Sequence, residues 1–181
     1  IKSFFYNKKL NHKVATVRAG NVLGGGDASK DRIIPDIYRA IKYKRNLILR
    51  NPDHVRPWQH VIDPLMGYLK LAKIQYSNNK KLDYQWNFGP NKENFKKVID
   101  VVNFIKKRNK FKYKIKKNLD IKETKVLKLN NINAKKKLGW RPVWDFKNTL
   151  IKVEEWQNLL DKGIKPKEIC EEQIFEYLKS E

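Results

Sequence analysis

The sequence predicts an α/β fold, because short β-branched stretches alternate with stretches of helical spacing along most of the chain. A first strand is predicted at 14–18 (VATVR), and the glycine-rich segment at 20–26 ends it. Apolar residues make up 40% of the 181 residues and include five Trp, which is enough to form a packed core. Intrinsic disorder is therefore not expected.

The first half of the chain alternates regularly between helices and strands. Ile34, Ile37 and Ile41 recur at helical spacing, and Asn-Pro and Gly-Pro pairs stop the strands that precede them. The predicted elements are a helix at 33–44, a strand at 47–50, a short strand at 58–61, a helix beginning at 63–64 and a strand at 84–88.

The second half continues in the same way, and the opening stretch at 1–10 reads as the end of a helix that starts elsewhere. The predicted elements are a helix through Phe95, Val98, Val102 and Ile105, a half-exposed strand at 111–115, a strand at 126–129, a helix at 132–138 ended by Gly139, a helix capped by Asp145 and a last helix after Pro166.

Cysteine usage and hydropathy restrict the class of protein. Cys170 is the one cysteine, so a disulfide within the chain is impossible and a cysteine-based metal site is not expected. No apolar run approaches the roughly 20 residues of a membrane-spanning helix, and no signal peptide is visible. We expect a cytoplasmic protein that makes no membrane contact.

The formal net charge of +22 has two interpretations. Nucleic-acid binding is one, because clustered cations displace counterions from phosphates. Composition is the other, because Lys far outnumbers Arg, accompanies abundant Asn and Ile, and is scattered in short runs. We favour composition and expect no nucleic-acid partner.

The segment RAGNVLGGGD (18–27) is the first candidate for a binding site. A strand that ends in Gly-Asn and three further glycines lets the backbone approach a ligand closely, and Asn21 offers both a donor and an acceptor. A structural glycine-rich turn is the alternative. The segment is neither a P-loop nor a GxGxxG fingerprint.

Two further segments place arginines where they could meet an anion. Arg32 directly precedes a predicted helix, where it could face a phosphate or instead pair in solvent with Asp31 or Asp36. Arg56 precedes Pro57-Trp58, which stiffen the chain beside the charge. His60 lacks zinc-ligand spacing and is interpreted as a core histidine.

Taken in order, the segments RAGNVLGGGD, DRIIPDIYRA, RNPDHVRPWQHV, WNFGPN and LGWRPVW resemble the CDP-glucose 4,6-dehydratases of the extended short-chain dehydrogenase/reductase superfamily. The resemblance runs from about residue 3 to at least 144 and is strongest over 14–72. The resemblance implies substrate contacts at Asn21, Arg32, Ile33, Ile48, Leu49, Arg50, Arg56 and Asn87, and cofactor contacts at Ala19 and Gly20.

The resemblance also implies an architecture and a reaction. The chain would hold the last strands and helices of a Rossmann-type domain plus a small α/β substrate-binding domain, divided as 1–30, 31–61, 62–91 and 92–181. The whole enzyme would use NAD to convert CDP-glucose to CDP-4-keto-6-deoxyglucose and would form a homo-oligomer. Cations near Arg32, Arg50 and Arg56 would help to attract the dianionic substrate.

The family's glycine-rich NAD motif and its Tyr-x-x-x-Lys pair are not found at their family positions in this sequence. Tyr38 and Lys42 satisfy the bare pattern, but they lie on the segment that resembles the substrate-domain helix. We therefore expect no catalytic residue here and interpret the chain as the C-terminal part of a longer, NAD-dependent hydro-lyase.

The sequence departs from the family at Ala28, where relatives carry an aromatic residue, and at Lys122, where a His is expected. Glu123 is the remaining candidate contact in that later segment. Three alternatives stay open: another nucleotide-sugar epimerase or dehydratase of the superfamily, a basic nucleic-acid-binding domain, and a non-catalytic remnant that folds only with a partner.

Overall fold

The computed structural model describes residues 14–77, 85–116 and 123–180 and confirms the predicted α/β fold. The predicted helix end at 1–10 lies outside the described residues. In chain order the elements are β1 (Thr16–Ala19), β2 (Asn21–Leu23), α2 (Ile33–Lys42), β3 (Leu47–Leu49), β4 (Val55–His60), α3 (Ile62–Ser77), β5 (Gln85–Phe88), η1 (Lys92–Asn94), β6 (Phe95–Lys97), α4 (Val98–Lys106), β7 (Tyr113–Ile115), α5 (Ile132–Leu138), α6 (Phe146–Asp161) and α7 (Pro166–Ser180).

The described residues form three small sheets, and the chain changes sheet between β1 and β2. β1 pairs in parallel with β5, whereas β2 pairs in parallel with β4, which in turn pairs antiparallel with β6. β3 and β7 form a separate parallel pair. Gly20 allows the change of partner, because a Cβ at this position would lie 2.4 Å from the carbonyl oxygen of Pro57.

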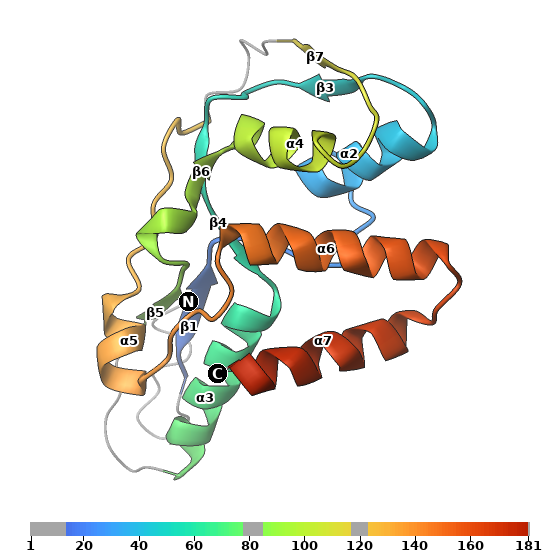
Figure 1. Cartoon of the computed structure of the whole chain (residues 1–181). Helices are drawn as coiled ribbons and strands as arrows, with labels where there is room; N and C mark the ends of the chain where they lie inside the picture. The colour runs from blue at the N-terminus through green and yellow to red at the C-terminus, as the bar shows by residue number, and fades with distance from the viewer. Residues whose placement is uncertain (1–13, 78–84, 117–122, 181) are drawn as a thin grey trace.

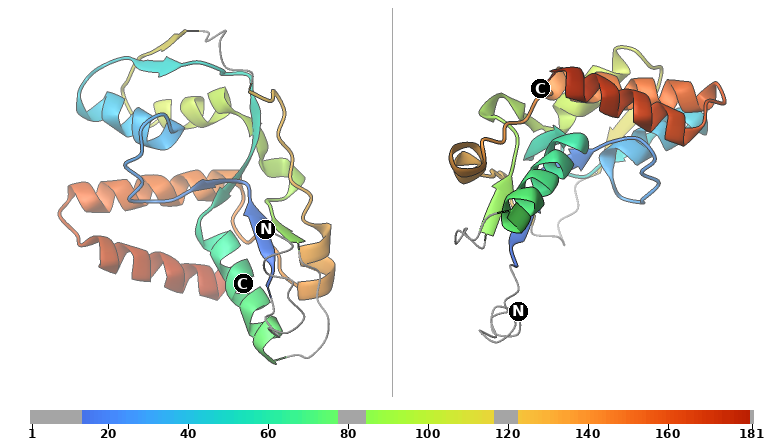
Figure 2. Two further views of the ribbon diagram at one scale, coloured as in Figure 1. Left: turned by 180° about the vertical axis from the view of Figure 1, so that it is seen from behind. Right: turned by 90° about the horizontal axis from the view of Figure 1, so that it is seen from below.

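The long helix α6 crosses the middle of the molecule, with α2, α4, β3 and β7 on one side and α7 on the other (Figure 1). Seen from behind, α3 and α5 flank the β1–β5 pair (Figure 2). The helix α3 follows β4 directly, so the two ends of the molecule are joined by one continuous strand and helix.

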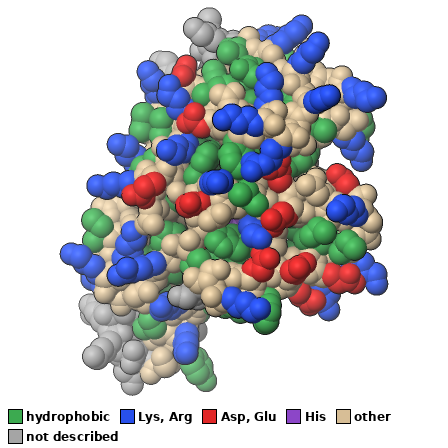
Figure 3. Space-filling model, viewed as in Figure 1, with side chains coloured by type: hydrophobic (Ala, Val, Ile, Leu, Met, Phe, Trp, Pro, Cys, Tyr) green, Lys and Arg blue, Asp and Glu red, His purple; other side chains and the backbone are tan. Residues whose placement is uncertain are grey.

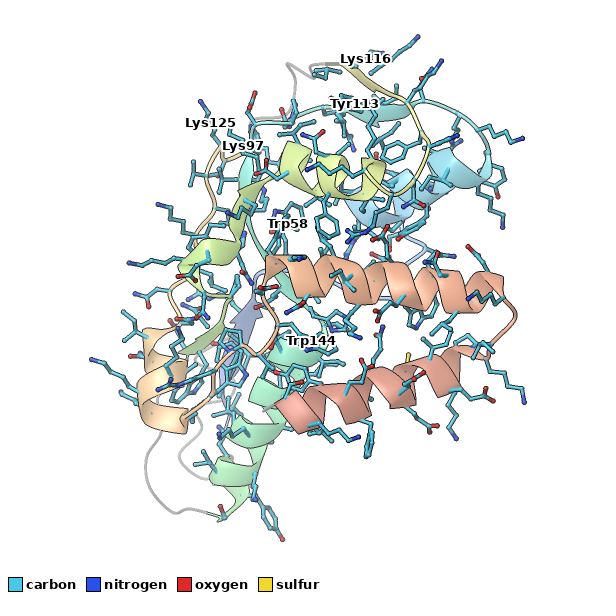
Figure 4. All side chains as sticks on the ribbon, viewed as in Figure 1. Trp58, Lys97, Tyr113, Lys116, Lys125 and Trp144 are labelled. Carbon is cyan, nitrogen blue, oxygen red and sulfur yellow. The ribbon has the colours of Figure 1, made fainter. Side chains whose placement is uncertain are left out.

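The core is divided between these two ends. One cluster packs α2, β3, β4 and α4 against α6 and contains Ile37, Trp58 and Leu150, while a second packs β5 against α3 and α5 through Trp86 and Phe88. Trp58 lies on the α4 side of α6 and Trp144 on the α7 side (Figure 4). A third small cluster joins Trp144 to Ile62 and Tyr177.

The predicted caps are confirmed. Gly139 follows α5 with a left-handed φ of 62°, and the Asp145 side chain accepts a hydrogen bond from the Asn148 N–H at the start of α6. The helix at 33–44 ends two residues early, at Lys42.

Three local predictions are wrong. The glycine-rich segment contains strand β2, and Phe95 lies in strand β6 because Asp100 accepts a hydrogen bond from the Lys97 N–H and starts α4 at Val98. The strand predicted at 126–129 is reduced to an isolated bridge between Val126 and Val55.

Candidate functional site

A cavity of about 670 Å³ opens between β2, the start of α2, β3 and β4. Eight of the ten residues predicted as ligand contacts line it: Gly20, Asn21, Arg32, Ile33, Ile48, Leu49, Arg50 and Arg56. Segments as far apart in the sequence as Gly20 and Glu123 therefore line the same cavity. Their roles as ligand contacts remain predictions.

Ala19 and Asn87 lie outside the cavity lining, on the neighbouring β1–β5 pair. Asn87 is opposite Arg18 in the register, one residue before the end of β1. Its amide oxygen is buried and has no hydrogen-bond partner among the described residues. An unpaired buried acceptor is costly, so this oxygen is a candidate for contact with a bound group.

Two of the glycines after Asn21 are required by packing within the protein, whereas the sequence predicted that they let a ligand approach the backbone. A Cβ at Gly25 would lie 1.9 Å from the ring of Trp156, and one at Gly24 would lie 2.8 Å from Val61. Gly25 is not part of the cavity lining, so its close approach is to helix α6 rather than to a ligand. The interpretation of all three glycines as ligand-facing is therefore corrected for Gly25.

Arg32 occupies the residue before α2 and remains largely exposed, with 65% of its side chain accessible. Its ion-pair partner is Asp27 at 3.6 Å. The two partners considered from the sequence, Asp31 and Asp36, pair instead with Arg50 and Arg39. A half-solvated guanidinium at the edge of a cavity is available to an anionic ligand.

Arg50 reaches across the mouth of the cavity from the end of β3. Its guanidinium donates to the carboxylate of Asp31 at 2.6 Å, and both side chains are exposed. Asp31 adopts a left-handed φ of 62°, which Asp tolerates better than most residues. This conformation turns the chain into α2 directly beside the cavity.

Arg56 is the buried cation of the site, with 6% of its side chain exposed. Its Nη1 donates to the carbonyl oxygens of Val55 and Lys125, at 2.9 and 3.4 Å. Its Nη2 lies 3.0 Å from His54 Nδ1 and 2.8 Å from Glu123 Oε1. His54 Nδ1 also lies 3.4 Å from Glu123 Oε2, so the histidine, Arg56 and Glu123 form one network.

Glu123 completes this network and is the residue that the sequence assigned least securely. The hydrogen bond from Arg56 lowers its pKa below the ordinary value of 4.5, and Asn51 Nδ2 donates to its second oxygen at 3.1 Å. Local pattern gives no sign of this pairing, since Arg56 and Glu123 are 67 positions apart. Only its place in the segment resembling the family pointed to it.

The balance of charge differs from the expectation of a cation excess. The cavity is lined by three arginines and by four carboxylates, namely Asp27, Asp31, Asp36 and Glu123. Burial opposes ionisation of Asp27, but hydrogen bonds from Ser29 and the charges of Arg32 and Arg39 outweigh it and lower its pKa. The attraction of a dianionic substrate therefore stays a prediction, and an anionic ligand would have to compete with carboxylates for the arginines of the cavity.

Two titratable residues outside the cavity lining are shifted by burial. Burial raises the pKa of Tyr38, and the rejection of the Tyr38–Lys42 pattern stays a prediction. His60 is 1% exposed, its ring lies 4.6 Å from that of Trp144, and burial lowers its pKa to about 3. It is the core histidine that the sequence predicted.

The described part of the chain lacks both a metal-binding cluster and a membrane-spanning helix. Within it, no group of three or more His, Cys, Asp or Glu side chains is arranged to hold a metal ion. None of its helices combines the length and apolar character that crossing a bilayer requires.

The fold is that of nucleotide-sugar epimerases and dehydratases of the extended short-chain dehydrogenase/reductase type. An epimerase from Methanothermobacter thermautotrophicus aligns with a TM-score of 0.74 at 17% identity, over 88% of this chain and 47% of its own. The dTDP-glucose 4,6-dehydratase of Bacillus anthracis, in complex with NAD, aligns with a TM-score of 0.69 at 18% identity, over 86% and 47%. UDP-glucuronic acid 4-epimerase from Bacillus cereus, in complex with UDP-glucuronic acid and NAD, aligns with a TM-score of 0.67 at 14% identity, over 81% and 45%.

The sequence is more specific than the fold. The chain is 39% identical to CDP-glucose 4,6-dehydratase of Salmonella typhimurium over 152 residues, which are 83% of this chain and 42% of the relative. The resemblance stated from the motifs is thereby confirmed, and the chain is a relative of that enzyme spanning less than half of its length. No family model matches the chain. The comparisons do not favour a nucleic-acid-binding domain, and on the face in Figure 3 the Lys and Arg side chains are scattered among uncharged and acidic side chains.

Proposed function

We propose that this chain is the substrate-binding portion of a nucleotide-sugar 4,6-dehydratase, a hydro-lyase that converts CDP-glucose to CDP-4-keto-6-deoxyglucose. The observation that carries the proposal is the 39% identity to CDP-glucose 4,6-dehydratase over 83% of the chain. The cavity adds geometric support, because it gathers guanidinium groups and an apolar wall of a size suited to a nucleotide.

The lining residues divide by chemistry into two parts. Arg32, Arg50 and Arg56 offer forked donors for the diphosphate, and Asn21 offers an amide from the adjacent strand β2. Ile48, half of which is exposed, presents an apolar side chain from β3 that would fit the face of a pyrimidine ring. Leu49, the next residue of the strand, is 2% exposed and packs into the core, so only its backbone would be available to the ligand. Binding energy gathered on the nucleotide would orient the sugar at the reacting end.

NAD fits the residues that the resemblance assigns to it. Ala19 and Gly20 stand at the carboxyl end of the parallel strand β1, the edge at which such sheets bind ligands, and Gly20 also reaches the cavity wall. Bound NAD would supply hydride acceptance and hydride return in the internal redox elimination. The backbone at Ala19 and Gly20 would hold the nicotinamide end beside the sugar.

We further propose the division of the chain that the resemblance implies. Residues 1–30 and 62–91 would belong to a Rossmann-type domain, and residues 31–61 and 92–181 to the substrate-binding part. The glycine motif and the Tyr-x-x-x-Lys pair would be supplied by the remainder of the enzyme, in a cytoplasmic homo-oligomer.

Calorimetric titration of the 181-residue chain with CDP and with UDP tests the binding site. Arg32→Ala removes an exposed cavity arginine without disturbing the core, and we expect about tenfold weaker CDP binding. Lys167→Ala, which removes an exposed cation from α7, is the matched control and should leave affinity unchanged. Equal affinity of wild type and Arg32→Ala would show that CDP does not use this cavity, and tighter binding of UDP would contradict the proposed nucleobase.

A further inference from the structure

We infer that Glu123 is a displaceable counterion of Arg56, which competes with the diphosphate of the ligand and thereby sets the affinity of the site. This inference rests on the proposed function, since it concerns the same cavity. It assigns Glu123 a role opposite to that of a ligand contact: its carboxylate occupies, in the free protein, the place that a phosphate oxygen takes in the complex.

The contacts of Arg56 show which partner can leave. Two are backbone carbonyls, of Val55 and Lys125, and one is the ring nitrogen Nδ1 of His54. These three hold the guanidinium in place whatever the ligand does. Glu123 is the carboxylate among the four partners, and half of its side chain is exposed, whereas Arg56 is almost fully buried.

The energetics of a buried cation explain why the free protein carries this pair. A buried guanidinium without a counterion is strongly destabilising, so Glu123 neutralises Arg56 while the cavity holds no anion. The hydrogen bond from Arg56 and the further one from Asn51 keep the carboxylate in position and ionised. A diphosphate offers the same charge complement and can replace Glu123, which then moves into solvent.

The Arg50–Asp31 pair provides an internal comparison at the same cavity. Both of its side chains are exposed, at 41% and 73%, so water already screens Arg50 and the pair is worth little. If negative charge near the cavity acted only by general repulsion, removing Asp31 or Glu123 would strengthen ligand binding equally. A counterion of a desolvated arginine must have the larger effect.

The test is calorimetric titration of wild type, Glu123→Gln and Asp31→Asn with CDP at one ionic strength, together with thermal unfolding of each. We expect Glu123→Gln to bind CDP about tenfold more tightly and to unfold at a lower temperature without ligand, with a larger upward shift on adding CDP. Asp31→Asn keeps a residue that tolerates the left-handed conformation and should change affinity about twofold or less.

Three results would overturn the inference. Equal gains in both variants would reduce Glu123 to general repulsion, and weaker binding by Glu123→Gln would make it a ligand contact; both leave the proposed function standing. Absence of CDP binding by wild type and Glu123→Gln alike would overturn the proposed function as well. If the glutamine variant does not fold, Glu123→Asp decides, because its shorter side chain draws the charge back from Arg56 and should give an affinity above that of wild type.

Discussion

Asp63 makes the stability of this protein depend on pH in an unusual direction. The residue is completely buried in the first turn of α3, where its Oδ1 accepts hydrogen bonds from the Val143 N–H at 2.8 Å and the Tyr177 hydroxyl at 2.7 Å. Its Oδ2 is buried with no hydrogen-bond partner among the described residues. Burial outweighs these bonds and raises the pKa of Asp63 from 3.8 to about 6.

The direction in which the free energy of unfolding changes with pH follows from proton binding by the folded and unfolded states. Between pH 4 and pH 6 the folded state holds more protons than the unfolded state, so this group stabilises the fold at low pH and loses that contribution as pH rises. With a pKa of about 6 in the folded state and 3.8 in the unfolded state, the free energy of unfolding falls by about 1.4 kcal/mol between pH 5 and pH 8. The Asp63→Asn variant cannot ionise at this position. Its free energy of unfolding, relative to that of wild type, should therefore rise by about 1.4 kcal/mol between pH 5 and pH 8.

Urea unfolding followed by tryptophan fluorescence at pH 5, 6, 7 and 8 measures the difference. Tyr177→Phe removes a hydrogen bond that lowers the Asp63 pKa, so its own pH dependence should be steeper than that of wild type. Asp161→Asn removes an exposed carboxylate from the end of α6 and serves as the matched control, with a flat difference from wild type. A difference between Asp63→Asn and wild type that stays constant from pH 5 to pH 8 would refute the assignment of a raised pKa.

Two further predictions concern the packing and capping of α6. Gly25→Ala places a methyl group against the Trp156 ring and should lower the free energy of unfolding by about 1–3 kcal/mol, part of which the second change Trp156→Leu should restore; an unchanged urea midpoint would contradict the close approach. Asp145→Ala removes the N-cap of α6 and should cost about 1 kcal/mol in the same assay, whereas Asp145→Asn, which keeps an acceptor, should cost less.

The sequence predicts the helices better than the strands. Periodicity and caps are local signals, so α2 and α5 begin and end within about two residues of the predicted positions, and α6 and α7 begin within about one residue of theirs. Strands here are three to six residues long and depend on their partners. The three-residue segment Asn21–Leu23 lies between glycines and is too short to give a strand signal, and β2 forms because β4 lies beside it.

The candidate site shows the same division between local and distant information. The resemblance to the family transferred positions such as Arg32 and Arg56 one by one, and the fold brings them to a single cavity. The ion pairs of the site could not be assigned from the resemblance, because a sequence does not show which carboxylate contacts which guanidinium. The pairing of Glu123 with Arg56 therefore required the structure.

The change of sheet at Gly20 fixes a distance between two proposed ligand contacts. Ala19 ends β1 and Asn21 begins β2, and two residues of extended chain span at most about 7 Å. Arg32 and Ile48, by contrast, reach the cavity from α2 and β3, which have no such short connection to β1. Opening or closing of the cavity would thus change the distance of Arg32 and Ile48 from β1. Covalent geometry would meanwhile keep the proposed cofactor contact at Ala19 and the proposed substrate contact at Asn21 at a constant distance.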